Sequence, residues 1–164
     1  MAKYRKLSRT SSQRKALLRG QVTALLANGK IVTTEAKAKE VRKIAEGLIA
    51  LAVKEKDNFE EVTVTAKVPR KDKDGKRVKE VVDGKKVTVY DEVQKTIKKD
   101  NPSRLHARRQ MLKVLYNVNG KDITNKMFDE VAPKYVDRNG GYTRIVKIGQ
   151  RKGDGALEVV LELV

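Results

Sequence analysis

Residues 140–164 read "GGYTRIVKIGQRKGDGALEVVLELV", and this closing stretch decides the fold. Apolar and polar residues alternate from Leu157 to Leu163, which is typical of a strand with one buried face. Residues 142–148 alternate less cleanly and are predicted to be the partner strand of an antiparallel hairpin. The first strand and the loop also carry several cations, so the hairpin needs an anion to take up that charge. The residues expected to pack inward are Leu157, Val159, Leu161 and Leu163.

About four helices are predicted upstream of this hairpin. The first begins at Thr10, which stands three residues before Gln13 in the spacing of a capping box. It ends near Gly29, a residue that tolerates positive φ. Pro102 stops the segment that precedes the third helix. The predicted N-terminal residues of the other three helices are Thr34, Ser103 and Asp122.

Apolar residues recur at helical spacing in each of these segments. Pro133 is expected either to bend the fourth helix or to lie in the first turn of a separate short helix. The order of helices followed by a terminal hairpin predicts an α+β domain, with the helices packed on a small mixed sheet. Ile31 and Val32 offer a third strand. The predicted inward stripes are Val41, Ile44, Leu48 and Leu51 in the second helix, Leu105, Met111, Leu112, Leu115 and Val118 in the third, and Ile123, Met127, Phe128, Val131 and Tyr135 in the fourth.

The composition changes between residues 57 and 100. "EEVTVTAKV" and "KVTVYDEV" alternate and are rich in Val and Thr, and the Asp-Gly pairs between them mark tight turns. This segment is predicted to be an inserted β-hairpin or small meander, although its charge also permits partial disorder. The expected organisation is a basic arm at residues 1–9, a single domain formed by residues 10–56 and 101–164, and the extension at residues 57–100.

The charge balance is strongly basic. The chain has 38 Lys and Arg against 21 Asp and Glu, a net charge of +17, and such an excess calls for an anionic partner. The first 20 residues contain seven basic residues and no acidic one, whereas residues 57–100 contain 12 basic and 10 acidic residues. Nucleic acid, an anionic membrane surface and acidic proteins are all compatible with this charge. The basic start lacks the apolar stretch of a secretory signal, so a cytoplasmic protein is expected, with an organelle transit peptide as the alternative.

Catalytic and metal-binding patterns are lacking in the sequence. The chain has no cysteine and a single histidine, His106, so neither a thiolate metal site nor a cofactor is expected. His106 is interpreted as a helix-surface residue, with a phosphate or base contact as the alternative. The "GQRKGDG" loop does not match a P-loop and is either a flexible turn or a basic tip that reaches phosphates. We therefore expect that the protein is not an enzyme.

Nucleic acid is the favoured partner because cations are concentrated on the arm and at the entry to the first helix. Arginine there is suited to bidentate phosphate contacts. Aromatic residues make up only 4% and form no stacking platform, which argues against a reader of single strands. These features favour a small basic domain that recognises the shape and phosphates of folded RNA. A DNA-binding protein and an RNA-processing enzyme remain as alternatives.

Four blocks of the sequence stand out: "YRKLSRTSSQRKALLR" (Tyr4–Arg19), "KIVTTEAKAKEVR" (Lys30–Arg42), "LHARRQ" (Leu105–Gln110) and "GGYTRIVKIGQRKGDGA" (Gly140–Ala156). In this order they resemble the family of bacterial large-subunit ribosomal protein seventeen. The departure is residues 57–100, where members of the family usually have only a short link. The resemblance says nothing about the role of this insertion.

The resemblance implies a structural, non-catalytic component of the large ribosomal subunit that binds ribosomal RNA and acts in translation in the cytoplasm. It implies an α+β fold and a place on the outer surface of the subunit, towards the side where the nascent chain emerges. It also suggests neighbouring ribosomal proteins as partners, small protein thirty-two among them. The RNA-contacting residues expected on the arm and at the helix entry are Lys3, Tyr4, Arg5, Lys6, Arg9, Arg14 and Arg19, followed elsewhere by Arg42, Arg108, Arg109, Arg144, Arg151 and Lys152.

Overall fold

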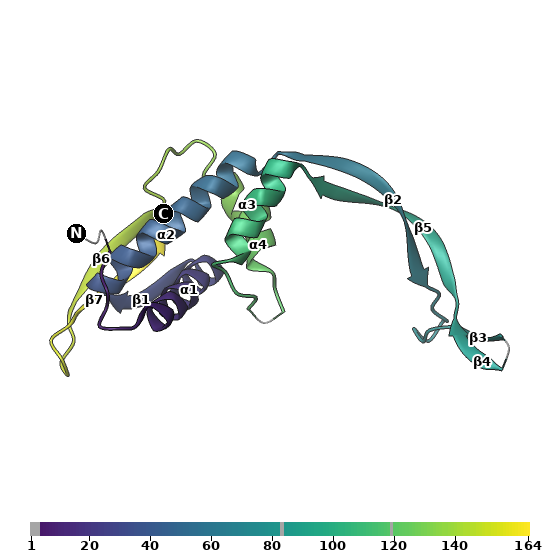
Figure 1. Ribbon diagram of the computed structural model, residues 1–164, viewed down its shortest axis with the longest axis horizontal. Helices are drawn as coiled ribbons and strands as arrows, with labels where there is room; N and C mark the ends of the chain where they lie inside the picture. Colours follow the sequence, from purple (N-terminus) through teal and green to yellow (C-terminus); the bar gives the residue numbers. More distant parts are fainter. Residues whose placement is uncertain (1–3, 83, 119) are drawn as a thin grey trace. The chain divides into compact units, whose positions relative to one another are not determined.

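The computed structural model describes residues 4–82, 84–118 and 120–164 (Figure 1). The chain divides into two units. The first comprises the residues up to Asn58 together with Pro102–Val164, and the second comprises Phe59–Asn101. The predicted α+β class is confirmed, because the first unit packs helices against a sheet and the second is made of antiparallel strands.

Helix α1 (Ser11–Asn28) has the ends that its sequence predicts. The Thr10 side chain accepts a hydrogen bond from the Gln13 backbone N–H, and the Gln13 side chain accepts one from the Thr10 backbone N–H at 3.4 Å. Gly29 follows with φ +80°, and its N–H donates to the Leu25 carbonyl at 2.7 Å. This left-handed residue turns the chain directly from α1 into strand β1 (Lys30–Thr34).

The sheet of the first unit has three strands in the order β1-β7-β6, where β6 is Thr143–Gln150 and β7 is Leu157–Leu163. The predicted C-terminal hairpin and third strand are both present. All pairs are antiparallel, so the sheet is not mixed in strand direction. The turn at Gly29 explains this, because the Leu163 N–H donates to the Gly29 carbonyl and holds the start of β1 against the end of β7.

Helices α1 and α2 (Glu35–Glu55) cover one face of this sheet (Figure 1). Val159 and Leu161 on β7 are fully buried against them, as predicted. The opposite face carries exposed aliphatic side chains, with Val32 64% and Ile148 57% exposed. The helices and the sheet therefore form two layers, and no helix or strand of the described residues covers the other face of the sheet.

Helix α2 buries a wider face than the predicted stripe. Val41 and Leu48 are buried, whereas Ile44 and Leu51 are only partly buried and Ile49 is completely buried. The helix packs against the sheet, α1 and α3 at once, so more of its circumference is covered. Thr34 occupies the N-cap position, but its side chain makes no capping hydrogen bond.

Helix α3 (Pro102–Leu112) is shorter than predicted and presents a different face to the core. Met111 and Leu115 are buried as expected, but Leu112 is 48% exposed and Arg104 is buried in its place. The inward positions of the helix are 104, 107 and 111, a helical spacing that excludes 112. The Ser103 hydroxyl donates to Glu55 Oε2 at 2.8 Å rather than capping the helix.

The fourth predicted helix is one continuous helical run with a π-helical middle. It consists of α4 (Ile123–Lys126), the π-helix η1 (Met127–Val131) and α5 (Ala132–Lys134). The Ala132 N–H bonds to the carbonyl of Met127, five residues back, directly before Pro133, which has no N–H to donate. The predicted inward residues Ile123, Met127, Phe128, Val131 and Tyr135 are all buried.

The second unit is an antiparallel extension (Figure 1). Strands β2 (Phe59–Pro69) and β5 (Tyr90–Asp100) pair along their whole length, and we call this two-stranded ribbon the stem. Beyond it lie the short strands β3 (Lys79–Val82) and β4 (Lys85–Thr88), also paired antiparallel. We call residues 70–89, between the two stem strands, the tip.

Candidate nucleic-acid interface

The described part of the basic arm, residues 4–9, is held on the body by a clamp around Arg14. Arg14 Nη2 forms an ion pair with Glu40 Oε2 of α2 at 2.9 Å, and Arg14 Nε donates to the Arg5 carbonyl at 2.7 Å. The Arg14 guanidinium also lies over the Tyr4 ring, 4.6 Å from its centroid. One side chain from the first turn of α1 therefore joins the arm to α2.

Glu40 is nearly buried and stays ionised. Burial acts to raise its pKa, but the Arg5 backbone N–H, Lys43 and Arg14 outweigh that effect and hold the pKa of Glu40 below its ordinary value. The carboxylate thus binds the arm through the Arg5 backbone and through Arg14 together. A buried, ionised carboxylate of this kind fixes the path of the arm at neutral pH.

The arm turns sharply at Leu7 and Ser8, where both residues have positive φ, 58° and 52°. The Leu7 side chain packs against the core, which supports this left-handed conformation. Arg5, Lys6 and Arg9 remain exposed, and none of the three makes an ion pair with another described residue. The clamp therefore fixes the backbone of the arm and leaves three cationic side chains to solvent.

Two shallow grooves next to the clamp are rich in cations. The first runs between the arm and α2, and the second runs between α1, α2 and the segment after α3. Aliphatic side chains form the bottom of the second groove, and lysine and arginine side chains line its edges. These cations are suited to bind a phosphate backbone. The residues that line the first are Arg5, Lys39, Glu40, Arg42, Lys43 and Glu46, and those that line the second are Arg14, Lys15, Leu18, Arg19, Ile44, Lys113 and Val114.

Several predicted contact residues are engaged inside the protein. Arg19 Nε donates to the Val114 carbonyl at 3.1 Å, and its guanidinium stacks on Tyr116 at 4.0 Å. Arg42 pairs with Glu46 at 3.2 Å, one turn along α2. Arg108 donates to Asn125 and lies over the Phe128 ring. These arginines connect neighbouring elements, so less of their hydrogen-bonding capacity is directed outward.

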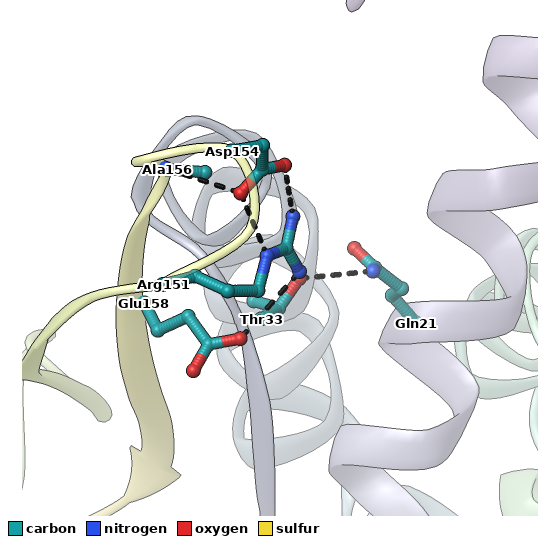
Figure 2. Close-up of polar contacts among 6 residues, drawn as sticks. All are labelled: Gln21, Thr33, Arg151, Asp154, Ala156 and Glu158. Atoms are coloured by element: carbon teal, nitrogen blue, oxygen red, sulfur yellow. Dashed lines mark hydrogen bonds and ion pairs between the residues drawn. The ribbon is translucent and has the colours of Figure 1, made fainter.

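The C-terminal hairpin shows the same pattern (Figure 2). Arg151 donates to both carboxylate oxygens of Asp154, at 2.9 and 2.6 Å, and pairs with Glu158 at 3.5 Å. The hydrogen bond from Arg151 is the largest cause that lowers the pKa of Asp154 to about 2. Arg144 pairs with Glu162 across the strands at 3.6 Å. Much of the charge on the hairpin is thus balanced locally, while Lys152 stays exposed.

The predicted contact residues therefore fall into two groups. Lys3 lies outside the described residues, and Tyr4 forms part of the clamp. The predicted set omitted the lysines that line the grooves, although the spacing of Lys39 and Lys43 on one face of α2 was visible in the sequence. The engaged group is Arg14, Arg19, Arg42, Arg108, Arg144 and Arg151, and the exposed group without an ion pair in the described chain is Arg5, Lys6, Arg9, Arg109 and Lys152.

His106 lies on the exposed surface of α3, where its ring nitrogen contacts the Gln110 side chain at 2.8 Å. Among the described residues, no three His, Asp or Glu side chains are grouped so that they could hold a metal ion. In the same part of the chain, no helix has both the length and the apolar character needed to cross a bilayer.

Comparison with known proteins identifies the family. Residues 17–164 match the family described as ribosomal protein L17. The chain belongs to the ribosomal protein L17 family. It is 73% identical to the large ribosomal subunit protein bL17 of Lachnospira eligens and 51% identical to that of Acetivibrio thermocellus, with all of both chains covered in each comparison. The bL17 protein of Clostridium botulinum is 42% identical, again over both whole chains.

Membership of the L17 family makes this protein a structural constituent of the large ribosomal subunit and not an enzyme. The expectation from the sequence blocks is thereby confirmed, and the RNA-processing enzyme is excluded. Ribosomal RNA and other ribosomal proteins follow as its partners in general terms.

Proposed function

We propose that this L17 protein binds ribosomal RNA through the arm, the two cationic grooves and the loop of the C-terminal hairpin. The observation that carries the proposal is the clamp around Arg14, which fixes the backbone of the arm while Arg5, Lys6 and Arg9 remain exposed. A fixed backbone lowers the entropy cost of binding, because the chain need not be ordered by the RNA. The surface acts through phosphate contacts, which position the protein without reading bases.

The engaged and exposed residues have different roles in this proposal. Arg14, Arg19 and Arg151 shape the surface through their internal partners. The cations proposed to meet phosphate directly are Arg5, Lys6, Arg9, Lys15, Arg109, Lys113 and Lys152.

Protein partners are expected on the uncovered face of the sheet. Val32 and Ile148 are exposed there, and Val146 is 43% exposed beside them. An aliphatic surface of this kind suits a protein neighbour better than RNA. The proposed neighbours are other large-subunit proteins, small protein thirty-two among them, in the ribosome of the bacterial cytoplasm.

The test is binding of protein-free large-subunit ribosomal RNA across a salt series, with the triple variant Arg5→Gln, Lys6→Gln and Arg9→Gln. Each phosphate contact contributes roughly 0.7–0.9 to the slope of log affinity against log salt, so the triple variant should flatten the slope by about 2. The matched control replaces three stem lysines, Lys67, Lys95 and Lys99, with Gln and removes the same charge. Equal slopes for the two variants would exclude the arm as a binding element.

The same assay addresses the DNA-binding alternative. At physiological salt, duplex DNA should compete far less well than a folded fragment of ribosomal RNA, because the surface is proposed to fit the shape of the RNA. Equal competition would mean that the protein responds to polyanion charge alone.

A further inference from the structure

The basic and acidic residues of the insertion nearly cancel in number, but they are unevenly distributed, so that the stem and the tip have opposite net charges. The stem, residues 59–69 and 90–100, contains 4 basic and 5 acidic residues. The tip, residues 70–89, contains 8 basic and 4 acidic residues. A segment that is close to neutral as a whole is therefore basic at its far end.

The stem is a regular spacer. Its two strands form eleven consecutive residue pairs, from Phe59 opposite Asp100 to Pro69 opposite Tyr90. At about 3.3 Å per residue, it separates the tip from the point where the chain enters the ribbon by roughly 35 Å. Three of the four lysines in the stem lie opposite a glutamate of the other strand. Lys67 is opposite Glu92, Lys99 is opposite Glu60, and Lys98 lies over the Phe59 ring at 4.8 Å.

The tip has a defined structure of its own. Arg70 closes the end of the stem, because its Nε donates to both carboxylate oxygens of Asp91, at 3.0 and 3.1 Å. Its backbone N–H donates to the Val89 carbonyl, and its carbonyl accepts from the Val78 N–H, both at 2.9 Å. A turn at Gly75, with φ +75°, and the β3–β4 pair complete the tip. The cations are therefore presented by folded backbone.

Arg70 forms an ion pair with Asp91, and the other seven basic residues at the tip differ from it in this respect. All seven are exposed, and none forms an ion pair with any residue in the part of the chain that the structure describes. Six of them are lysines, which act as compact point charges and suit phosphates more than planar groups. The seven residues are Lys71, Lys73, Lys76, Arg77, Lys79, Lys85 and Lys86.

We propose that the tip of the insertion is a second RNA-binding site, which takes phosphates of a ribosomal RNA segment separate from the one bound by the body. The proposal rests on the proposed function, because the body supplies the first attachment. A second site on the same chain then binds at high effective concentration, so even weak lysine–phosphate contacts add to the total affinity. The stem sets how far the tip lies from the point where the chain enters the ribbon, and the charge separation confines the contact to the tip.

The test uses the full-length protein, protein-free large-subunit ribosomal RNA and a salt series. The tip variant replaces Lys73, Lys76, Lys85 and Lys86 with Gln. It should flatten the salt slope by about 3 and weaken binding at least tenfold at low salt. The stem variant replaces Lys67, Lys95, Lys98 and Lys99 with Gln, which removes the same charge, and should stay within about twofold of the wild type. A Lys→Arg version of the tip variant keeps the charge and should restore binding.

Each result decides between the proposals. If the tip variant behaves like the stem variant while the arm variant binds weakly, the tip proposal is wrong and the arm proposal stands. If the wild type shows no preference for ribosomal RNA over duplex DNA, the proposed function is wrong and the tip proposal falls with it. If the tip variant binds RNA normally but loses binding to vesicles of anionic lipid, the tip meets a membrane surface and the RNA assignment is overturned.

Discussion

The clamp around Arg14 predicts a specific effect of Glu40→Gln. The substitution keeps the size of the side chain and its acceptor for the Arg5 N–H but removes the charge that Arg14 and Lys43 face. Removing one partner of a fully buried ion pair costs roughly 3–5 kcal/mol. Here the Glu40 side chain is 5% exposed, but that of Arg14 is 20% exposed and regains some hydration. The expected loss of unfolding free energy is therefore about 2 kcal/mol.

Thermal unfolding provides the first measurement. For a chain of this size, about 2 kcal/mol corresponds to a fall in Tm of roughly 7 °C. Glu130→Gln is the matched control, because it makes the same charge change at a side chain that is 62% exposed and 3.9 Å from Lys126. That variant should stay within about 0.5 kcal/mol of the wild type. Equal Tm values for the two variants would refute the clamp.

The difference between wild type and Glu40→Gln should also depend on pH. The folded-state pKa of Glu40 lies below its ordinary value of 4.5. A lowered folded pKa means that the stabilisation is complete above the unfolded pKa and is lost as pH falls through the folded pKa. The two proteins should therefore differ most at pH 7 and converge in acid. A difference that persists unchanged at pH 2 would show that the charge of Glu40 is not what holds the arm.

RNA affinity provides a third measurement, for which the two explanations predict opposite changes. Glu40→Gln removes one negative charge from the protein, so a purely electrostatic surface would bind RNA more tightly. If the clamp pre-orders the arm, the variant must order it on binding and affinity should fall instead. Tighter binding by this variant would contradict the role given to the clamp.

Two further predictions concern the fold. Replacing Phe59–Asn101 with a short Gly-Ser link should leave the body folded, because Phe59 and Asp100 are directly paired and the ends to be joined lie close together; loss of cooperative thermal unfolding would contradict this. Leu161→Ala should cost about 2–5 kcal/mol in chemical denaturation because Leu161 is fully buried, whereas Leu112→Ala, at a 48% exposed site, should cost less than about 0.5 kcal/mol, and similar losses would contradict the observed rotation of α3.

Local signals in the sequence predicted local structure well. The capping box at Thr10 and Gln13, the turn at Gly29 and the alternation from Leu157 to Leu163 each depend on residues within a few positions of one another. Such features carry their physical cause with them, because the hydrogen bonds or the buried face are encoded in the same short segment. The α+β class followed from their order along the chain.

Features that depend on distant partners were not predictable in this way. Leu112 matches a helical stripe in the sequence, but the packing of α3 turns Arg104 inward instead. The Glu40 partner of Arg14 is 26 residues away, and the Val114 carbonyl that accepts from Arg19 is 95 residues away. Only the tertiary fold brings these groups together, so a count of charges could not separate clamping arginines from exposed ones.

The summed charge of residues 57–100 concealed the basic tip of the insertion, because a sum along the chain ignores which residues lie opposite one another. Residues 57–100 hold 12 basic and 10 acidic residues, and that sum places the segment outside the main charged surface. The strand register shows that acids such as Glu60 and Glu92 lie opposite stem lysines. Only one stem lysine, Lys95 opposite Val64, lacks such a neighbour, so the excess of cations lies at the tip, which the linear sum does not reveal.

The pairing pattern also determines where the net charge of the protein acts. An internal ion pair is neutral as a unit, so Arg14 with Glu40, Arg70 with Asp91 and Arg151 with Asp154 add nothing to the +17. That charge resides on the cations without acidic partners in the described chain, among them Lys15 and Lys113 at the second groove and the six lysines of the tip. Substituting a paired arginine should therefore reduce stability first, and substituting a rim or tip lysine should reduce RNA affinity with little change in Tm. The two effects separate because the arginines with several internal contacts shape the surface, while the lysines carry the charge that a polyanion neutralises.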